Sequence, residues 1–310
     1  MFLEPKTTQY GSHMVMTNVN KTTKTKYINI DTKFRDEYNY NKTINYNITL
    51  PQRINDVKNI HITSVEIPMT FYNIASSLGN NYFKITNNTT GNIEMVTLDD
   101  GQYNSTSLSA AINSKISQLS QANLDLKYYV DSNKSVFYSD SSTFTIDFAV
   151  DSTGEFDKYN FKSKLGWLLG FRNTTYTVTY AYDETPAPGT GPDGQPLYYS
   201  EHPINLLGTK YLYLAIDEFS SGNQNSFVST LPTSMINKNI IARISLDRAT
   251  HTYGTYFPAN KMNGYLMSDN RSFTGKIDIQ KLNVQLLDEN GIPVDLNSYD
   301  FSFCMEVDHE

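Results

Sequence analysis

The sequence has little of several residue types that carry common functions. Its 310 residues include one cysteine, Cys304, and one tryptophan, and only 18% of them are charged. A single cysteine excludes an intrachain disulfide, which fits a protein kept in a reducing compartment. The longest apolar run, 165–171, is far shorter than the roughly 18 residues that cross a bilayer. No transmembrane segment is therefore expected.

Basic charge is also scarce. The formal net charge is −7 and the isoelectric point is about 5.3. Proteins that bind nucleic acid without regard to its sequence normally carry a basic surplus that neutralises phosphates. We therefore expect no direct contact with nucleic acid.

Motifs of the common enzyme and cofactor families are missing. The sequence contains neither the GxSxG of a nucleophile elbow nor the GxxxxGK[ST] phosphate loop. No two of the internal histidines are spaced like zinc ligands, and one cysteine cannot build a thiolate site. We predict no enzyme activity, no catalytic residue, no cofactor and no metal site.

Aromatic residues are abundant instead. They make up 13% of the chain, with 23 tyrosines and 16 phenylalanines. Disordered chains are poor in aromatic residues, so this composition argues for a folded protein. Tyr, Phe, Ile, Val and Thr are also the residues that fit a half-buried pleated sheet, so it favours β-structure.

The first residues are expected to lie outside the fold. Residues 11–14 read Gly-Ser-His-Met, which has the form of a cloning scar, so residues 1–13 are interpreted as an expression tag. Residues 14–26 are rich in Asn, Lys and Thr, with nothing to bury, and are expected to form a flexible N-terminal arm.

Apolar residues at every second position predict most of the strands. One run, Ile44 to Leu50, is expected to end at Pro51. The next, 57–67, needs a bulge near Thr63 or Ser64 to keep its apolar side chains on one face. The remaining predicted strands are 27–31, 82–85, 93–98, 124–130, 135–138, 144–149, 176–182, 211–217, 240–246, 273–287 and 301–307.

Helical signals are few. Residues 106–119 carry apolar side chains at spacings of three and four, which predicts an amphipathic helix capped by Asn104, Ser105 or Thr106. Residues 164–171 are expected to form a short helical turn. The Pro/Gly-rich stretch 185–197 is too long for a tight turn and is interpreted as a loop. Residues 288–291, Asp-Glu-Asn-Gly, predict a hairpin turn.

Many short strands with one clear helix predict an all-β protein. The expected fold is an antiparallel jelly-roll β-sandwich with long insertions and one amphipathic helix. Residues 27–98 and 208–308 would build the sandwich, and 99–207 would be an inserted β-rich region with the helix and the Pro/Gly loop. Two side-by-side β domains are the alternative.

Several side chains invite a chemical interpretation, and each also has a structural one. Three adjacent acid pairs could suit a glycosidase, but their position at strand ends is typical of solvated turns. Cys304 lies in the alternating last strand, which favours a buried structural thiol over a nucleophile. His61 lies between two isoleucines and is expected on the polar face of its strand. The acid pairs are Asp99-Asp100, Asp217-Glu218 and Asp288-Glu289.

Loop tyrosines could stack on sugars. The candidates are Tyr198, Tyr199, Tyr253 and Tyr256. Tyrosine is so common in this chain that chance also explains their presence.

Three segments together resemble a known class of proteins. The first is KYINIDTKFRD at 26–36, followed by VKNIHITSVEIP at 57–68. The second is GQYN at 101–104 with the helix after it, and the third spans 277–303, from IDIQKL to YDFSF. The arrangement resembles the minor-capsid or penton-like jelly-roll structural proteins of nucleocytoplasmic large DNA viruses (giant viruses). Its most specific part is the opening Asn-Ile-Asp-x-x-Phe-Arg-Asp.

The resemblance implies a jelly-roll fold and a non-enzymatic role as a building block of the virion, made in the host cytoplasm. The expected partners are other capsid subunits, including further copies of the chain as a pentamer or trimer. The arm, Thr17 to Lys26, is expected to contact an adjacent subunit. The alternative is a carbohydrate- or receptor-binding β-sandwich module on a viral surface or fibre. A β-sandwich enzyme, with two carboxylates in one cleft, is a third hypothesis.

Overall fold

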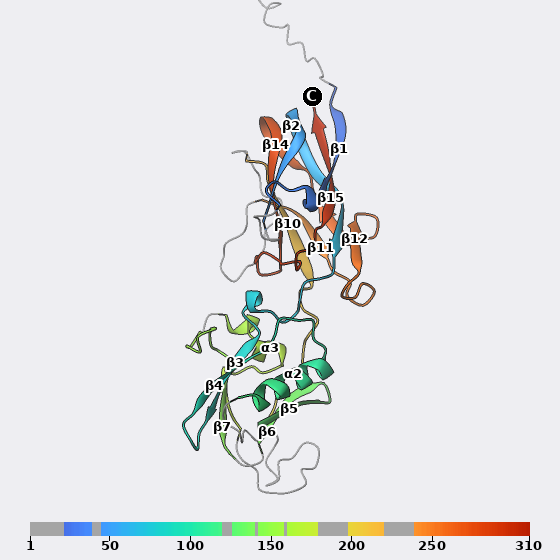
Figure 1. The fold of residues 1–310 in the computed structure, drawn as a ribbon. Helices are drawn as coiled ribbons and strands as arrows, with labels where there is room; N and C mark the ends of the chain where they lie inside the picture. The colour runs from blue at the N-terminus through green and yellow to red at the C-terminus, as the bar shows by residue number, and fades with distance from the viewer. Residues whose placement is uncertain are drawn as a thin grey trace, which may run out of the picture.

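The computed structural model describes residues 22–38, 45–119, 126–139, 142–157, 160–178, 198–219 and 239–310. The predicted tag, most of the predicted arm and the Pro/Gly loop 185–197 lie outside these residues. The described strands form three antiparallel sheets of eight, four and three strands. Figure 1 shows them in two lobes, which we call the sandwich lobe and the small lobe.

The sandwich lobe holds the eight-stranded sheet. The N–H of Ile62 donates to Ser268 Oγ at 3.0 Å. Ser268 lies on the strand at one end of the sheet and Ile62 on a strand in its interior, so the sheet curls round and encloses one hydrophobic core. In spatial order its strands are β1 (Lys24–Asp31), β15 (Ser302–His309), β2 (Tyr46–Pro68), β14 (Arg271–Leu287), β10 (Tyr211–Asp217), β11 (Ile240–Ser245) and β13 (Leu266–Ser268), while β12 (Tyr256–Asn260) also pairs with β2.

The long strand β2 contains the predicted bulge. Its pairing with β15 joins Ser64 to Cys304 and Ile62 to Met305, so Thr63 has no partner residue. The extra residue restores the facing, because Ile60, Ile62, Val65 and Ile67 are all buried. The prediction of a bulge at Thr63 or Ser64 is confirmed.

The predicted end of a strand at Pro51 is wrong. β2 runs without a break from Tyr46 to Pro68. Proline has no N–H to give to a ladder, and it is tolerated here because the register of β2 against β14 shifts between Thr49 and Ile54. The irregular pairing removes the need for a donor at Pro51.

The small lobe holds the other two sheets and the helices. One sheet has the order β4 (Ile93–Thr97), β3 (Tyr82–Asn87), β7 (Phe144–Asp147), β8 (Thr175–Val178), and the other has β5 (Leu126–Asp131), β6 (Lys134–Ser139), β9 (Tyr198–Tyr199). The helices are α2 (Ser105–Ser117) and the short α3 (Leu165–Leu168). The described residues also form three single 3₁₀ turns: η1 (Thr32–Phe34) after β1 in the sandwich lobe, η2 (Ser76–Leu78) between β2 and β3, and η3 (Phe161–Ser163) just before α3.

Helix α2 agrees closely with the sequence pattern. It buries Leu108, Ile112 and Ile116 in the core of the small lobe. Its N-cap is Asn104, whose side-chain oxygen accepts from the N–H of Ser107, and the hydroxyl of Ser107 accepts from the N–H of Asn104. This reciprocal pair satisfies two backbone donors at the helix start.

The hairpin of β3 and β4 belongs to the small lobe and not, as predicted for all of 27–98, to the sandwich. β3 pairs with β7 as well as with β4. Phe83 on β3 lies 5.8 Å from the ring of Phe137 and 5.7 Å from that of Phe148, so the hairpin completes an aromatic core. The change of sheet therefore comes between Pro68 and Tyr82.

Two chain segments join the lobes, near residues 69–81 and 204–210. The buried side chain of Asn73 ties them together. Its amide nitrogen donates to the carbonyls of Tyr103 and Leu206 at 2.8 and 2.9 Å, and its oxygen accepts from the N–H of Tyr103. One side chain therefore fixes both connecting segments to the start of the region that carries α2.

The turn at 288–291 is present, but the hairpin it begins is short. Gly291, with φ of 79°, donates its N–H to Asp288. The returning chain makes only the bridge from Pro293 to Leu287, and the last strand β15 pairs with β1 and β2 instead. The predicted antiparallel, mainly β fold with few helices is confirmed for the described residues. None of the described helices is long and apolar enough to cross a membrane.

Candidate functional site

The segment with the most specific resemblance, 26–36, forms the end of the large sheet. Its first half is β1, which pairs along its whole length with β15, from Lys24 opposite His309 to Asp31 opposite Ser302. β1 is the terminal strand of this sheet among the described strands. Its other edge therefore presents backbone donors and acceptors to a further strand.

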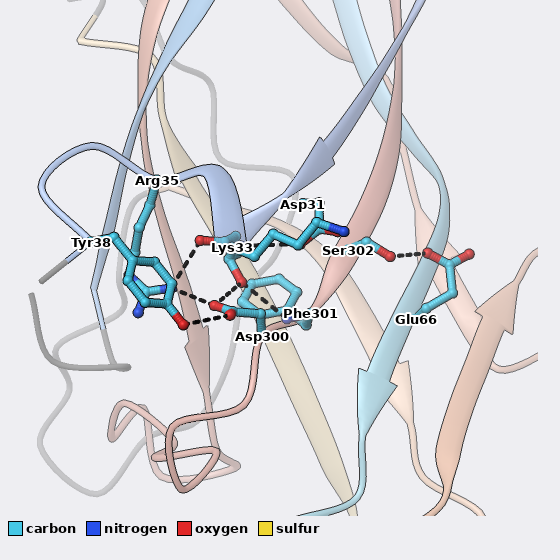
Figure 2. Close-up of polar contacts among 9 residues, drawn as sticks. Asp31, Lys33, Arg35, Tyr38, Glu66, Asp300, Phe301 and Ser302 are labelled. Carbon is cyan, nitrogen blue, oxygen red and sulfur yellow. Dashed lines mark hydrogen bonds and ion pairs between the residues drawn. The ribbon is translucent and has the colours of Figure 1, made fainter.

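The second half of the segment is clamped to the chain just before β15. The Thr32 N–H donates to the Phe301 carbonyl at 2.9 Å, and the Phe301 N–H donates to Thr32 Oγ1 at 3.0 Å. Arg35 forms an ion pair with Asp300, and the Thr32 hydroxyl donates to the same carboxylate. Figure 2 shows Arg35 and Tyr38, which follow η1, directed at the carboxylate of Asp300, which lies in the chain just before β15.

The Arg35 guanidinium is almost fully buried. Its side chain is 2% exposed and that of Asp300 is 17% exposed. The guanidinium carbon lies 3.9 Å from the ring centre of Tyr38 and 5.2 Å from that of Tyr46, a cation–π arrangement. Burial raises the pKa of Tyr46, while the charge of Arg35 acts in the opposite direction. Because the Arg35 guanidinium is buried with one carboxylate partner, replacing Asp300 by a neutral residue would leave a buried charge without compensation.

The last residue of the motif binds β2. The carboxylate of Asp36 accepts the Thr49 hydroxyl at 2.6 Å, and the Asp36 N–H donates to the carbonyl of Asn47. Polar residues of the motif thus hold the N-terminal segment to β2 and to the chain before β15.

Between these anchors the segment exposes large side chains. Tyr27 is 66% and Phe34 is 74% exposed. The ammonium of Lys33 pairs with Asp31 at 2.9 Å and lies 4.8 Å from the Phe34 ring centre. The hydrogen bond and charge of Asp31 raise the pKa of Lys33. We call Tyr27, Lys33 and Phe34 the exposed triad.

The surface beside the triad is acidic. The hydroxyl of Ser302 donates to Glu66 at 2.8 Å, as Figure 2 shows. Glu306 hydrogen-bonds Tyr27 and raises the pKa of its phenol. The end of the sheet therefore offers to solvent two aromatic rings, a residue type enriched at protein interfaces, together with one cation and several carboxylates.

The adjacent acid pairs serve turns and joints. Asp100 accepts from the N–H and hydroxyl of Ser76, and Asp99 pairs with Lys115. Asp288 closes the turn at 288–291 by accepting from the N–H groups of Asn290 and Ile292, and burial raises its pKa.

Glu218 differs from the other acids, because it is fully buried in an ion pair. Its carboxylate lies 2.8 Å from Arg271, whose side chain also donates to the carbonyls of Ile216 and Asn239. The group therefore anchors β14 to the end of β10.

The predicted position of Cys304 is wrong in one respect. The thiol is half-buried and belongs to the outer face of β15, because Phe303 and Met305 take the inward positions. His61 lies opposite Glu306 and 3.7 Å from its carboxylate, on the same outer face. In the part of the chain that the structure describes, no three His, Cys, Asp or Glu side chains gather in a way that could hold a metal.

The candidate tyrosines do not form one site. Tyr199 lies in the small lobe, where its hydroxyl donates to Asp131 at 2.7 Å. Tyr253 and Tyr256 belong to the sandwich lobe and are 47% and 64% exposed. Tyr253 stacks on Tyr72 at 5.9 Å, a contact that no local pattern indicates, because the two lie far apart in the sequence.

The clamp of Arg35 and Asp300 was also missed at the sequence level. Both residues lie in segments singled out for their resemblance, but 265 positions separate them. Arg35 follows the end of a predicted strand, and an arginine at such a place is only a weak sign of a buried ion pair. Its partner Asp300 comes into reach because β1 pairs with β15.

Comparison with known proteins places the chain in a family. A family model matches residues 15–285, most of the chain. The chain belongs to the family of unknown function DUF5901. No curated protein matches it. Among solved structures, that of the selenomethionine-labelled mavirus penton protein is similar to this chain, with a TM-score of 0.45 and 9% sequence identity over 93% of this chain and 99% of that one.

Proposed function

We propose that this chain is a non-enzymatic structural protein of a large DNA virus particle, a minor-capsid or penton-type building block that acts through subunit contacts. One observation carries the proposal. The motif with the most specific resemblance builds the terminal strand of the sheet, and the clamp between Arg35 and Asp300 holds it while the exposed triad faces solvent.

This arrangement suits assembly. A terminal strand can pair with a strand of a neighbouring subunit, and aromatic side chains are enriched at protein interfaces. The acids that could have formed a hydrolytic pair are engaged in turns and ion pairs, which supports a role without catalysis. The virion is then the place of action, with synthesis in the host cytoplasm.

The test is the solution mass of the purified protein across a range of concentrations, measured by light scattering. We expect a closed pentamer or trimer. The double variant Tyr27→Ser, Phe34→Ser should shift the equilibrium toward the monomer. Met262→Ser is the matched control, because Met262 is 99% exposed in a turn away from the motif. A monomer at every concentration, or an equal shift in the control, would contradict self-assembly through this surface.

The predicted contact of the N-terminal arm needs a modified deletion. Lys24, Thr25 and Lys26 pair with the end of β15, so a deletion through Lys26 would also weaken the sheet. A deletion that ends at Thr23 leaves β1 intact. We expect it to reduce incorporation into particles, and unchanged incorporation would refute the contact.

Binding of glycans or a receptor is the second candidate function. It is favoured by the stacked rings of Tyr72 and Tyr253, with the half-exposed Tyr299 near enough to affect the pKa of Tyr253. Aromatic faces of this kind stack on sugar rings. Binding on a glycan array that is lost in Tyr253→Ala would support this function, and an array without binding would reject it.

A further inference from the structure

A cavity of about 410 Å³ opens between the two lobes. One wall comes from the sandwich lobe, in the loop between β11 and β12. The facing wall comes from the residues just before α2 and from the connecting segments. Its lining includes Phe71, Asn104, Leu206, Arg248 and His251.

Of the described residues that line the cavity, only Arg248 has a charged side chain. Its Nε donates to the carbonyl of Thr209, and its guanidinium carbon lies 4.8 Å from the ring centre of Phe71. Among the described residues it makes no ion pair, and its Nη2 is buried without a hydrogen-bond partner. The arginines at 35, 53 and 271, in contrast, each pair with a carboxylate.

An unpaired, largely buried guanidinium is unfavourable, because a buried charge without a counter-ion loses its hydration. Burial lowers the pKa of Arg248, and the more distant charge of Glu289 opposes this effect only in part. The Glu289 carboxylate is itself engaged, since it accepts from the N–H of Lys210. The described part of the chain therefore holds a cation in this cleft without supplying its anion.

Other polar groups of the cleft also lack partners. The Nδ1 of His251 is buried without a hydrogen bond. Asn104 uses its side-chain oxygen to cap α2, which leaves its amide nitrogen to donate. Apolar side chains, among them Phe71 and Leu206, form part of the remaining wall, beside the polar Gln102 and Thr252. Cationic and neutral donors beside an apolar wall are complementary to an anion attached to an apolar body.

Gly208 of the connecting segment packs against the guanidinium of Arg248. It has φ of +67°, and a Cβ there would lie 3.3 Å from Nη2 of Arg248. A residue with a side chain would be strained by the positive φ and would displace the guanidinium slightly.

We propose that the cleft between the lobes binds a small organic anion, with its carboxylate or phosphate group at Arg248 and its apolar part against Phe71 and Leu206. A ligand there contacts both lobes at once. Occupancy of the cleft then links the sandwich lobe to the small lobe.

The experiment is calorimetric titration of the full chain with four probes: phenyl phosphate, benzoate, inorganic phosphate and benzyl alcohol. We expect phenyl phosphate or benzoate to bind more tightly than inorganic phosphate, and the comparison of the two decides between the phosphate and the carboxylate. Benzyl alcohol has the ring without the charge and should bind weakly or not at all.

Variants locate the binding. Arg248→Gln should weaken binding about ten- to hundredfold, because a charge-assisted hydrogen bond is lost. Arg243→Gln is the matched control, since Arg243 also stacks on a ring, that of Tyr211 at 4.1 Å, but lies outside the cleft. Arg248→Lys, which keeps the charge, should retain part of the affinity and shows that loss in the glutamine variant is not unfolding.

The proposal is overturned if none of the anions binds, if Arg248→Gln and Arg243→Gln weaken binding equally, or if benzyl alcohol binds as tightly as the anions. Inorganic phosphate that binds as tightly as phenyl phosphate would overturn the apolar part of the proposal.

Discussion

Arg35 illustrates how a short motif can act over a long distance in the sequence. Its guanidinium is stacked against Tyr38 and Tyr46 and neutralised by Asp300, so one side chain connects the turn after β1 to the chain before β15. Because the pair is shielded from water, its integrity depends on both partners. The motif therefore has a structural role even before any partner binds.

The variant Asp300→Asn tests this role. It leaves Arg35 buried without a counter-charge, so we expect the free energy of unfolding to fall by about 2–3 kcal/mol. The loss is smaller than for a fully buried pair, because the Asp300 side chain is 17% exposed. Denaturant titration measures the change. Asp278→Asn is the control, since its pair with Arg53 is exposed and should matter little. Equal losses in the two variants would contradict the account.

The buried carboxylate of Asp288 predicts a dependence on pH. Burial raises its pKa above the usual value near 4, so the folded state holds the proton more tightly than the unfolded state. Stability contributed by this group is therefore greatest below the ordinary pKa and falls as the pH rises through the raised one. Asp288→Asn removes the ionisable group and keeps an oxygen acceptor for the turn.

The melting temperature of the wild type and of Asp288→Asn should be compared between pH 3.5 and 7. We expect the variant to gain on the wild type as the pH rises and to keep that advantage at neutral pH. A difference that is constant with pH, or that grows as the pH falls, would show that Asp288 is not strained by its burial.

At the scale of elements, local patterns predict what local interactions decide. The bulge at Thr63 follows from a break in the alternation of β2, and the cap of α2 follows from Asn104 ahead of an amphipathic run. Pro51 misleads, because its tolerance depends on a register shift against β14, a strand more than 200 residues away. The assignment of β3 fails for the same reason: its alternation shows that it has a buried face but not which core that face meets.

The cap of α2 gives a prediction at this scale. Asn104→Ala removes the acceptor for the N–H of Ser107, and we expect a loss of about 1 kcal/mol in the free energy of unfolding. Asn104→Ser should recover most of the loss, because serine is also a good N-cap. Chemical denaturation followed by circular dichroism measures both variants. A serine variant as unstable as the alanine variant would show that Asn104 acts by some contact other than capping.

On the scale of the whole molecule, the two candidate surfaces lie at different places, and their places could not be predicted from the sequence. The clamp and the exposed triad lie on the sandwich lobe, whose strands come from both ends of the chain. The cleft around Arg248 lies where the two lobes meet. Long-range pairing decides both positions, so the motif could be recognised in the sequence but its surroundings could not be predicted.

The sandwich lobe and the small lobe each have a large hydrophobic core of their own, and this separation leads to a prediction about folding. The small lobe is one continuous segment with its own core, and the polar partners of Asn73 at Tyr103 and Leu206 lie inside it. A segment with a complete core can fold alone. We expect the fragment 73–207 to show a dispersed amide spectrum and cooperative thermal unfolding.

The fragment 208–310 is its control. It contains β10 to β15 but lacks β2, the strand that pairs with β12, β14 and β15, and it lacks β1 at the edge. Without β2 the apolar faces of those strands have no cover, so this fragment should remain unfolded or aggregate. If 208–310 folds and 73–207 does not, the small lobe depends on the sandwich lobe for its core, and the cleft between them is part of a single folding unit rather than a junction of two.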